Sequence, residues 1–96
     1  MDKQKIRGEL IDRSNNILAK YAEPEIVDSV SIMNMADKTV FLGSLRVYNE
    51  ERAGDVKKDL ENEIKSYGEL SIRVEKVVPC CAPSYIHISF NISIDK

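Results

Sequence analysis

Hydrophobic side chains recur at helical spacing in two segments of the chain. The first segment, Lys3 to Tyr21, carries them along one stripe and ends before Pro24, which cannot continue a helix. In its middle, Ser14 to Asn16 are weak helix formers that the stripe places mainly on the solvent side. The second segment, Asn49 to Gly68, begins with a residue type that caps helices and ends with a glycine that stops them. The pattern therefore predicts two amphipathic helices.

Four other segments have the pattern of β-strands, and the first, third and fourth of them alternate between apolar and polar residues with the typical period of two. The second segment has apolar residues on both parities, as expected of a central strand, and its Gly43 indicates a bulge or a close helix crossing. A short polar break joins the first two strands as a hairpin, and the sequence PCCAP connects the last two. The predicted strands are Ile26 to Met35, Thr39 to Tyr48, Leu70 to Val78 and Tyr85 to Ile94.

The order of these elements predicts a single α+β domain over residues 1–96. A ferredoxin-like fold whose first strand has been moved to the end has the same order, αββαββ, which is a circular permutation. Because the first and last strands of that fold are antiparallel neighbours, the third and fourth strands here should pair through the PCCAP loop. We therefore expect a two-layer sandwich in which two helices cover one face of a four-stranded antiparallel sheet, with the strands in the order third, fourth, second, first.

Composition indicates the class of protein and its cellular location. An apolar fraction of 43% and a charged fraction of 31% are ordinary for a soluble globular protein. The longest apolar runs are only a few residues, so no membrane span is predicted, and the N-terminal sequence has no apolar region typical of a secretion signal. A cytoplasmic location is the expectation that follows.

The second face of the predicted sheet has no helix over it and carries polar, aromatic and charged side chains. Because aromatic residues and arginine are enriched in interface cores, we expect a homodimer or a protein-interaction adaptor, through this face or through the exposed edge of Ile26 to Met35. RNA or single-stranded DNA stacked on the same face is an alternative, which the net charge of −2 and the lack of a Lys/Arg cluster disfavour. The candidate interface residues are Leu42, Arg46, Tyr48, Arg73, Tyr85 and His87.

Both cysteines and the only histidine of the chain lie in one stretch, VVPCCAPSYIHISF. Thiolate and imidazole are good ligands for zinc and copper, which makes Cys80, Cys81 and His87 candidate metal ligands. We expect the two thiols to be reduced, because a disulfide between adjacent cysteines strains the peptide bond between them. The four glycines are scattered and form no phosphate-binding loop, and no acid is placed to orient His87, so no enzymatic activity is predicted.

From about Glu25 to Pro79 the chain resembles the cytoplasmic C-terminal domain of cation diffusion facilitator transporters. The segments VDSVSIM, DKTVFLGSLRV, DVKKDLENEIKSYG and LSIRVEKVVP together look like that family's helix, hairpin, helix and strand. The resemblance implies a ferredoxin-like dimerisation module that senses metal through His and Asp residues on its strands. Asp28 falls where such a ligand would lie, whereas the second strand offers Ser44 and the third no histidine. With no transmembrane segment and an added fourth strand, this chain would be an isolated or diverged module.

The sequence thus predicts a non-enzymatic binding or dimerisation module. A metal-responsive regulatory domain is one form of it, with zinc or copper bound by Cys80, Cys81, His87 and Asp28.

Overall fold

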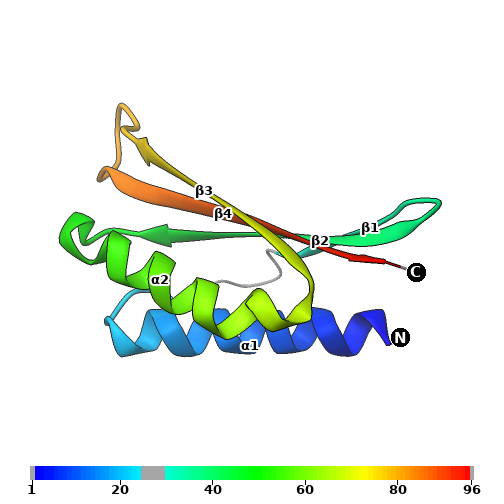
Figure 1. The fold of residues 1–96 in the computed structure, drawn as a ribbon. Helices are drawn as coiled ribbons and strands as arrows, with labels where there is room; N and C mark the ends of the chain where they lie inside the picture. The colour runs from blue at the N-terminus through cyan, green and yellow to red at the C-terminus, as the bar shows by residue number, and fades with distance from the viewer. Residues whose placement is uncertain (1, 25–29, 96) are drawn as a thin grey trace.

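The computed structural model describes residues 2–24 and 30–95 of the chain. Its elements follow the predicted order of two helices and four strands, with short 3-10 turns at both ends of the second helix. Both helices lie on the same side of the sheet (Figure 1). In chain order, the elements are α1 (Lys3–Lys20), β1 (Ser31–Asn34), β2 (Lys38–Val47), η1 (Glu50–Arg52), α2 (Ala53–Ile64), η2 (Lys65–Tyr67), β3 (Glu69–Val77) and β4 (Tyr85–Asp95).

Helix α1 begins and ends with hydrogen bonds that its local sequence supplies. The side chain of Asp2 accepts a hydrogen bond from the Lys5 amide, which satisfies one of the free N–H groups at the start of the helix. At the other end, Ala22 adopts a left-handed conformation with φ of 57°, and the Glu23 amide donates to the Leu18 carbonyl over 2.8 Å. This is a Schellman ending, in which alanine occupies the position that usually holds glycine.

The prediction that Ser14 to Asn16 lie mainly on the solvent side of this helix is wrong at Ser14. Ser14 is fully buried, together with Leu10, Ile17 and Leu18. Its hydroxyl group has no hydrogen-bond partner among the described residues. The small serine side chain therefore lies within the apolar stripe, on the side of the helix that packs against the sheet.

The second predicted helix is confirmed, in three parts. The side chain of Asn49 accepts a hydrogen bond from the Glu51 amide over 3.2 Å, as expected of a cap. The turn η1 leads into α2, whose buried side chains recur every three or four residues, and η2 ends at Gly68. A Cβ atom on Gly68 would lie 2.5 Å from the Ser93 carbonyl oxygen, so the glycine also allows the chain to pass close to β4.

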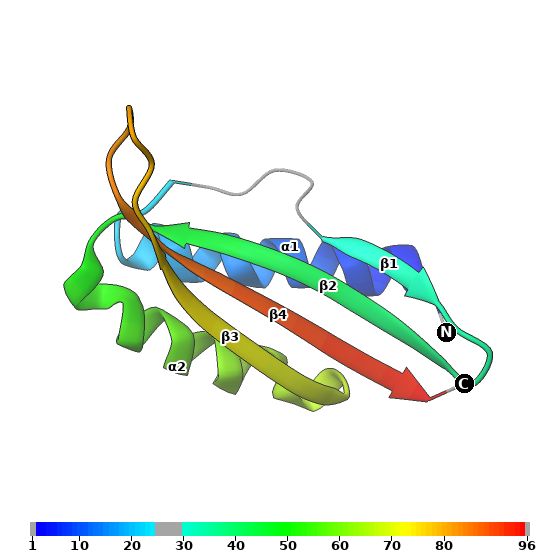
Figure 2. The same cartoon turned by 90° about the horizontal axis from the view of Figure 1, so that it is seen from above.

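The sheet is antiparallel throughout and has the order β1-β2-β4-β3, as predicted (Figure 2). Long strands β2 and β4 form its centre, with Gly43 paired to Phe90 and Leu45 to Ile88. Within the described residues β1 covers four of the ten positions predicted for the first strand; residues 26–29 of that prediction, with Asp28, lie outside the described residues.

One core joins the helices to the covered side of the sheet. Phe41, Leu45 and Val47 from β2 and alternate residues of β4 pack against α1 and α2. Gly43 lies on the same side, where the Phe90 ring covers it: an added Cβ would be 2.3 Å from the ring. A neighbouring aromatic ring, rather than the predicted bulge or helix crossing, therefore requires this glycine, because the pairing register runs through it without interruption.

Candidate interaction surface

The side of the sheet away from the helices, which we call the open face, carries the predicted interface residues. They lie on β2, β3 and β4 and at the strand ends, with parity opposite to the buried core. Tyr85 and His87 are half-buried, whereas Arg46 and Arg73 are exposed. The open face consists of Ser31, Met33, Leu42, Ser44, Arg46, Tyr48, Ser71, Arg73, Glu75, Tyr85, His87, Ser89 and Asn91.

The pairing register arranges this face in rows across the sheet. In one row, Arg46 on β2 and Glu75 on β3 flank His87 on β4. The row therefore carries a cation on one side of the central histidine and an anion on the other. This alignment depends on strand register and could not be found from alternation within any single strand.

Aromatic side chains gather with an arginine near one end of the open face. The ring centroids of Tyr48 and Tyr85 lie 5.7 Å apart, and the Arg46 guanidinium lies 4.7 Å from the centroid of the Tyr85 ring. Such an arginine is held by cation–π attraction, which orders its long side chain before any partner binds. Tyr48 remains 42% exposed and Met33, on β1, 48% exposed, so the face still presents apolar surface to solvent.

A shallow hollow of about 540 Å³ lies at the centre of the open face. Its walls are mostly small polar side chains on the central strands, with Arg73 at one side. The small side chains leave room for a bulkier group from another molecule. The hollow is lined by Ser31, Leu42, Gly43, Ser44, Ser71, Arg73, Ser89, Phe90 and Asn91.

The structure separates the predicted metal ligands into different parts of the fold. Cys80 and Cys81 are exposed in the loop between β3 and β4, with their Sγ atoms 3.2 Å apart. His87 belongs to the open face, in the row of Arg46 and Glu75. Across residues 2–24 and 30–95, no three His, Cys, Asp or Glu side chains are grouped so that they could hold a metal ion. The zinc or copper site therefore stays a prediction, and Asp28 is outside the described residues.

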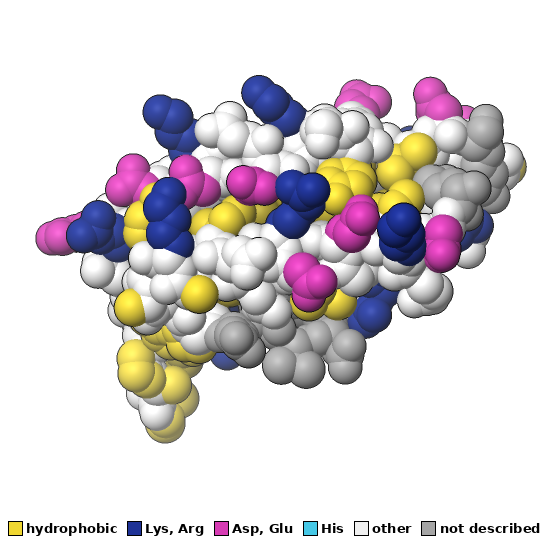
Figure 3. All heavy atoms as spheres, turned by 90° about the horizontal axis from the view of Figure 1, so that it is seen from below, with side chains coloured by type: hydrophobic (Ala, Val, Ile, Leu, Met, Phe, Trp, Pro, Cys, Tyr) yellow, Lys and Arg dark blue, Asp and Glu magenta, His cyan; other side chains and the backbone are white. Residues whose placement is uncertain are grey.

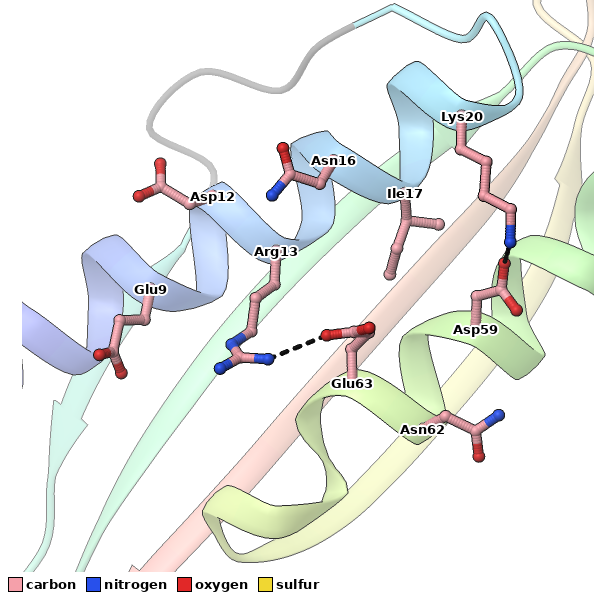
Figure 4. Close-up of a pocket in the computed structure, with 9 residues that line it drawn as sticks. All are labelled: Glu9, Asp12, Arg13, Asn16, Ile17, Lys20, Asp59, Asn62 and Glu63. Carbon is pink, nitrogen blue, oxygen red and sulfur yellow. Dashed lines mark hydrogen bonds and ion pairs between the residues drawn. The ribbon is translucent and has the colours of Figure 1, made fainter.

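A polar groove of about 650 Å³ between the two helices did not stand out in the sequence (Figure 4). Arg13 Nη1 contacts Glu63 Oε2 at 2.9 Å, and Lys20 Nζ contacts Asp59 Oδ2 at 3.0 Å. The partners in each pair are 50 and 39 residues apart, so no local spacing rule reveals them. Each dashed line in Figure 4 joins α1 to α2, so the charged side chains that line the groove connect the two helices by ion pairs.

Tyrosine hydroxyl groups extend this connection at both ends of the groove. Tyr21 donates a hydrogen bond to Asp59 over 2.7 Å, and this bond, with Lys20, holds the pKa of Asp59 below its usual value. The same bond to Asp59 raises the pKa of Tyr21. At the other end Tyr67 donates to Glu9 and accepts from Arg13, and partial burial is the main cause of its raised pKa. These polar groups satisfy one another within the chain.

Glu23 is a buried acid that no motif or spacing in the sequence singles out. Only 8% of it is exposed, and its two carboxylate oxygens each accept a backbone hydrogen bond of 2.9 Å, from the amides of Tyr48 and Asn49. The carboxylate thus satisfies the free N–H groups where β2 turns into η1. It fixes the end of α1 against the end of the open face that carries Tyr48.

No protein-family model matches this chain, and no curated protein or solved structure gives a significant match. The resemblance to the cation diffusion facilitator domain therefore stays a prediction. Within the described residues, the structure contains no helix that is both long enough and apolar enough to span a membrane.

Proposed function

We propose that this protein is a non-enzymatic association module that forms a homodimer through its open face. The observation that carries the proposal is the row in which Arg46 and Glu75 flank His87 with opposite charges. A two-fold dimer uses the same patch on both copies, so the patch has to be complementary to itself.

The strand order supplies this complementarity. A two-fold axis placed over β4 and parallel to it turns the β2 side of one copy onto the β3 side of the other. Arg46 of each copy then lies opposite Glu75 of the second copy, and two symmetric ion pairs form. Charge complementarity of this kind fixes the register of an interface and disfavours other partners.

In the neighbouring rows, the same two-fold arrangement places large side chains of one copy opposite small side chains of the other. Ser44 and Arg73 flank Ser89 in the next row, so the arrangement places the long Arg73 side chain against the small Ser44 of the second copy. The hollow at the centre of the open face provides space for this side chain. At the aromatic end, Tyr48 of one copy would lie over the β3 end of the other, where an aromatic group buries a large area.

The architecture of the domain also supports an association role. We infer that the domain is a circularly permuted ferredoxin-like sandwich, because its element order and its strand order β1-β2-β4-β3 are those of that fold with its first strand moved to the end. An architecture with both helices on one side leaves the other side of the sheet available for a partner. Metal-responsive regulation of such a dimer would use Cys80 and Cys81 in the loop between β3 and β4.

Sedimentation equilibrium at micromolar concentration tests the proposal. We expect wild-type protein at twice the 10.9 kDa of one chain and a Tyr48→Glu variant at the mass of one chain. Val74→Glu is the matched control: Val74 is 45% exposed, against 42% for Tyr48, but has the parity of the helix-covered side, so this variant should remain dimeric.

A wild-type monomer would contradict the proposal, and so would a Tyr48→Glu variant that remains dimeric. Single-stranded nucleic acid is the competing occupant of this face. Salt-dependent retention of a mixed oligonucleotide by monomeric wild-type protein, lost on Tyr48→Glu, would assign the open face to nucleic acid instead.

A further inference from the structure

The loop between β3 and β4 projects from one end of the sheet (Figures 1 and 2). It contains Val78 to Ser84 and places both cysteines between Pro79 and Pro83. Val78 is 72% exposed and both cysteine side chains are exposed. Hydrophobic side chains, a class that includes cysteine in the colouring of Figure 3, gather on this projecting end, whereas charged groups of both signs cover the helices.

The two thiols point in a common direction. Side chains of adjacent residues in an extended strand point to opposite faces, which would keep two neighbouring sulfur atoms apart. In this loop the backbone bends at Cys80 and Cys81, and their Sγ atoms lie only 3.2 Å apart. The bend therefore converts two adjacent residues into a pair of sulfur ligands that can reach the same atom.

We propose that Cys80 and Cys81 form a chelating dithiol for one trivalent arsenic centre per chain, without His87. This site goes beyond the proposed dimer and does not rest on it, because both sulfur atoms belong to one loop. It also differs from the zinc or copper site predicted from the sequence, since it needs only two protein ligands.

The number of ligands favours trivalent arsenic over zinc. Structural zinc is bound by four ligands in a tetrahedron at Zn–S distances of about 2.3 Å, and two thiolates supply only half of them. No third metal-binding side chain joins these two in the described parts of the chain. Trivalent arsenic forms three bonds in a narrow pyramid, so two thiolates and one hydroxide complete it. Soft thiolates also prefer soft partners of this kind.

The binding step balances without any oxidant or reductant. Arsenous acid, As(OH)₃, exchanges two As–O bonds for two As–S bonds, one to each Sγ atom. Each thiol proton leaves with a displaced hydroxide as water, so two water molecules are released. The third hydroxide stays on arsenic, whose oxidation state is unchanged.

Intact-mass spectrometry of the reduced, full-length protein with arsenite tests the site, and phenylarsine oxide serves as a second probe because it binds two neighbouring thiols. We expect one arsenic per chain and the loss of both free thiols. Because the second sulfur binds at the high effective concentration of an adjacent residue, Cys80→Ser and Cys81→Ser should each weaken binding by at least about tenfold. Both positions are exposed, so circular dichroism should show an unchanged fold.

His87→Ala is the matched control and should bind arsenite as the wild type does. The proposal is overturned if wild-type protein does not bind arsenite, if either serine variant binds equally well, or if His87→Ala loses binding. One zinc ion per two chains, held in preference to arsenic, would show that the thiols of two copies act together and would also overturn the single-chain site.

Discussion

The two faces of β4 differ in what their side chains contribute. Ile88, Phe90 and Ile92 point toward the helices and are at most 2% exposed. The alternating residues His87, Ser89 and Asn91 point to the open face and are half-buried. A single strand thus supplies both the centre of the core and the centre of the proposed interface. Stability therefore depends on one parity of the strand, which leaves the other parity available for binding.

The largest expected effect comes from adjacent residues on opposite faces of this strand. Phe90→Ala should lower the free energy of unfolding by about 3–5 kcal/mol, because it leaves a cavity in the core. Ser89→Ala, one residue away, should change it by about 0.5 kcal/mol or less. Urea denaturation followed by circular dichroism measures both. Similar losses for the two variants would break the distinction between the faces.

Gly43 tests the same distinction from the paired strand. A Cβ atom at this position would lie 2.3 Å from the Phe90 ring, so Gly43→Ala should cost about 1–3 kcal/mol of stability through overpacking. Gly54→Ala is the control: a Cβ there would meet no described heavy atom within 4 Å, and removing a helical glycine should stabilise the protein by about 0.4–1 kcal/mol. Thermal unfolding of the two variants should show shifts of opposite sign, and shifts of equal sign would contradict the packing described for Gly43.

Substitution of Glu23 tests the hydrogen bonds at the end of β2, next to the open face. Glu23→Ala leaves the amides of Tyr48 and Asn49 without their carboxylate acceptor, which should cost about 1.5–3 kcal/mol. The exposed Glu51→Ala, in η1, should change stability by about 0.5 kcal/mol or less. Denaturant unfolding distinguishes them. An unaffected Glu23→Ala protein would show that these hydrogen bonds do not fix the end of α1.

The smallest effect is expected far from the open face, in the groove between the helices. The pKa of Asp59 is lowered in the folded protein, first by the Tyr21 hydroxyl and then by Lys20. Its charged form therefore stabilises the fold above the unfolded-state pKa of about 3.9, and this contribution is lost as the pH falls through the lower folded-state pKa.

Removing the Tyr21 hydroxyl or the Asp59 carboxylate should change the titration of the protein in acid. Tyr21→Phe should raise the pKa of Asp59, measured by NMR titration of its carboxyl carbon. Asp59→Asn should reduce the dependence of Tm on pH below about pH 4 relative to wild type. An unchanged pKa of Asp59 in Tyr21→Phe would show that the hydroxyl group does not hold this carboxylate.

Periodicity along the sequence was enough for most of the fold, because each element buries one regular stripe or parity. The helix from Lys3 and the strands ending near Val47 and Val77 follow directly from that spacing. The strand order followed from the element order, because moving the first strand of a ferredoxin-like fold to the end keeps its antiparallel neighbours together. The prediction for Ser14 is wrong because a small polar residue can lie within an apolar stripe, and Ser14 is fully buried there.

The details of the surfaces depend on contacts between distant segments, which no single-segment pattern reveals. The residues of the open face were identified from parity, but the row of Arg46, His87 and Glu75 required the registers of three strands. The pairing of Lys20 with Asp59 likewise depends on how α1 and α2 pack beside each other. The distance between the two thiols depends on a bend in an irregular loop, for which the sequence gives only the flanking prolines.

A charge-reversal experiment tests the dimer most directly. Sedimentation equilibrium should show a dimer for wild-type protein and a monomer for Arg46→Glu, because two like-charged pairs would then oppose each other across the two-fold axis. Adding Glu75→Arg to the same chain restores both ion pairs in reverse, so the double variant should be dimeric again. Equal masses for the three proteins, or a double variant that stays monomeric while folded, would contradict the proposed dimer.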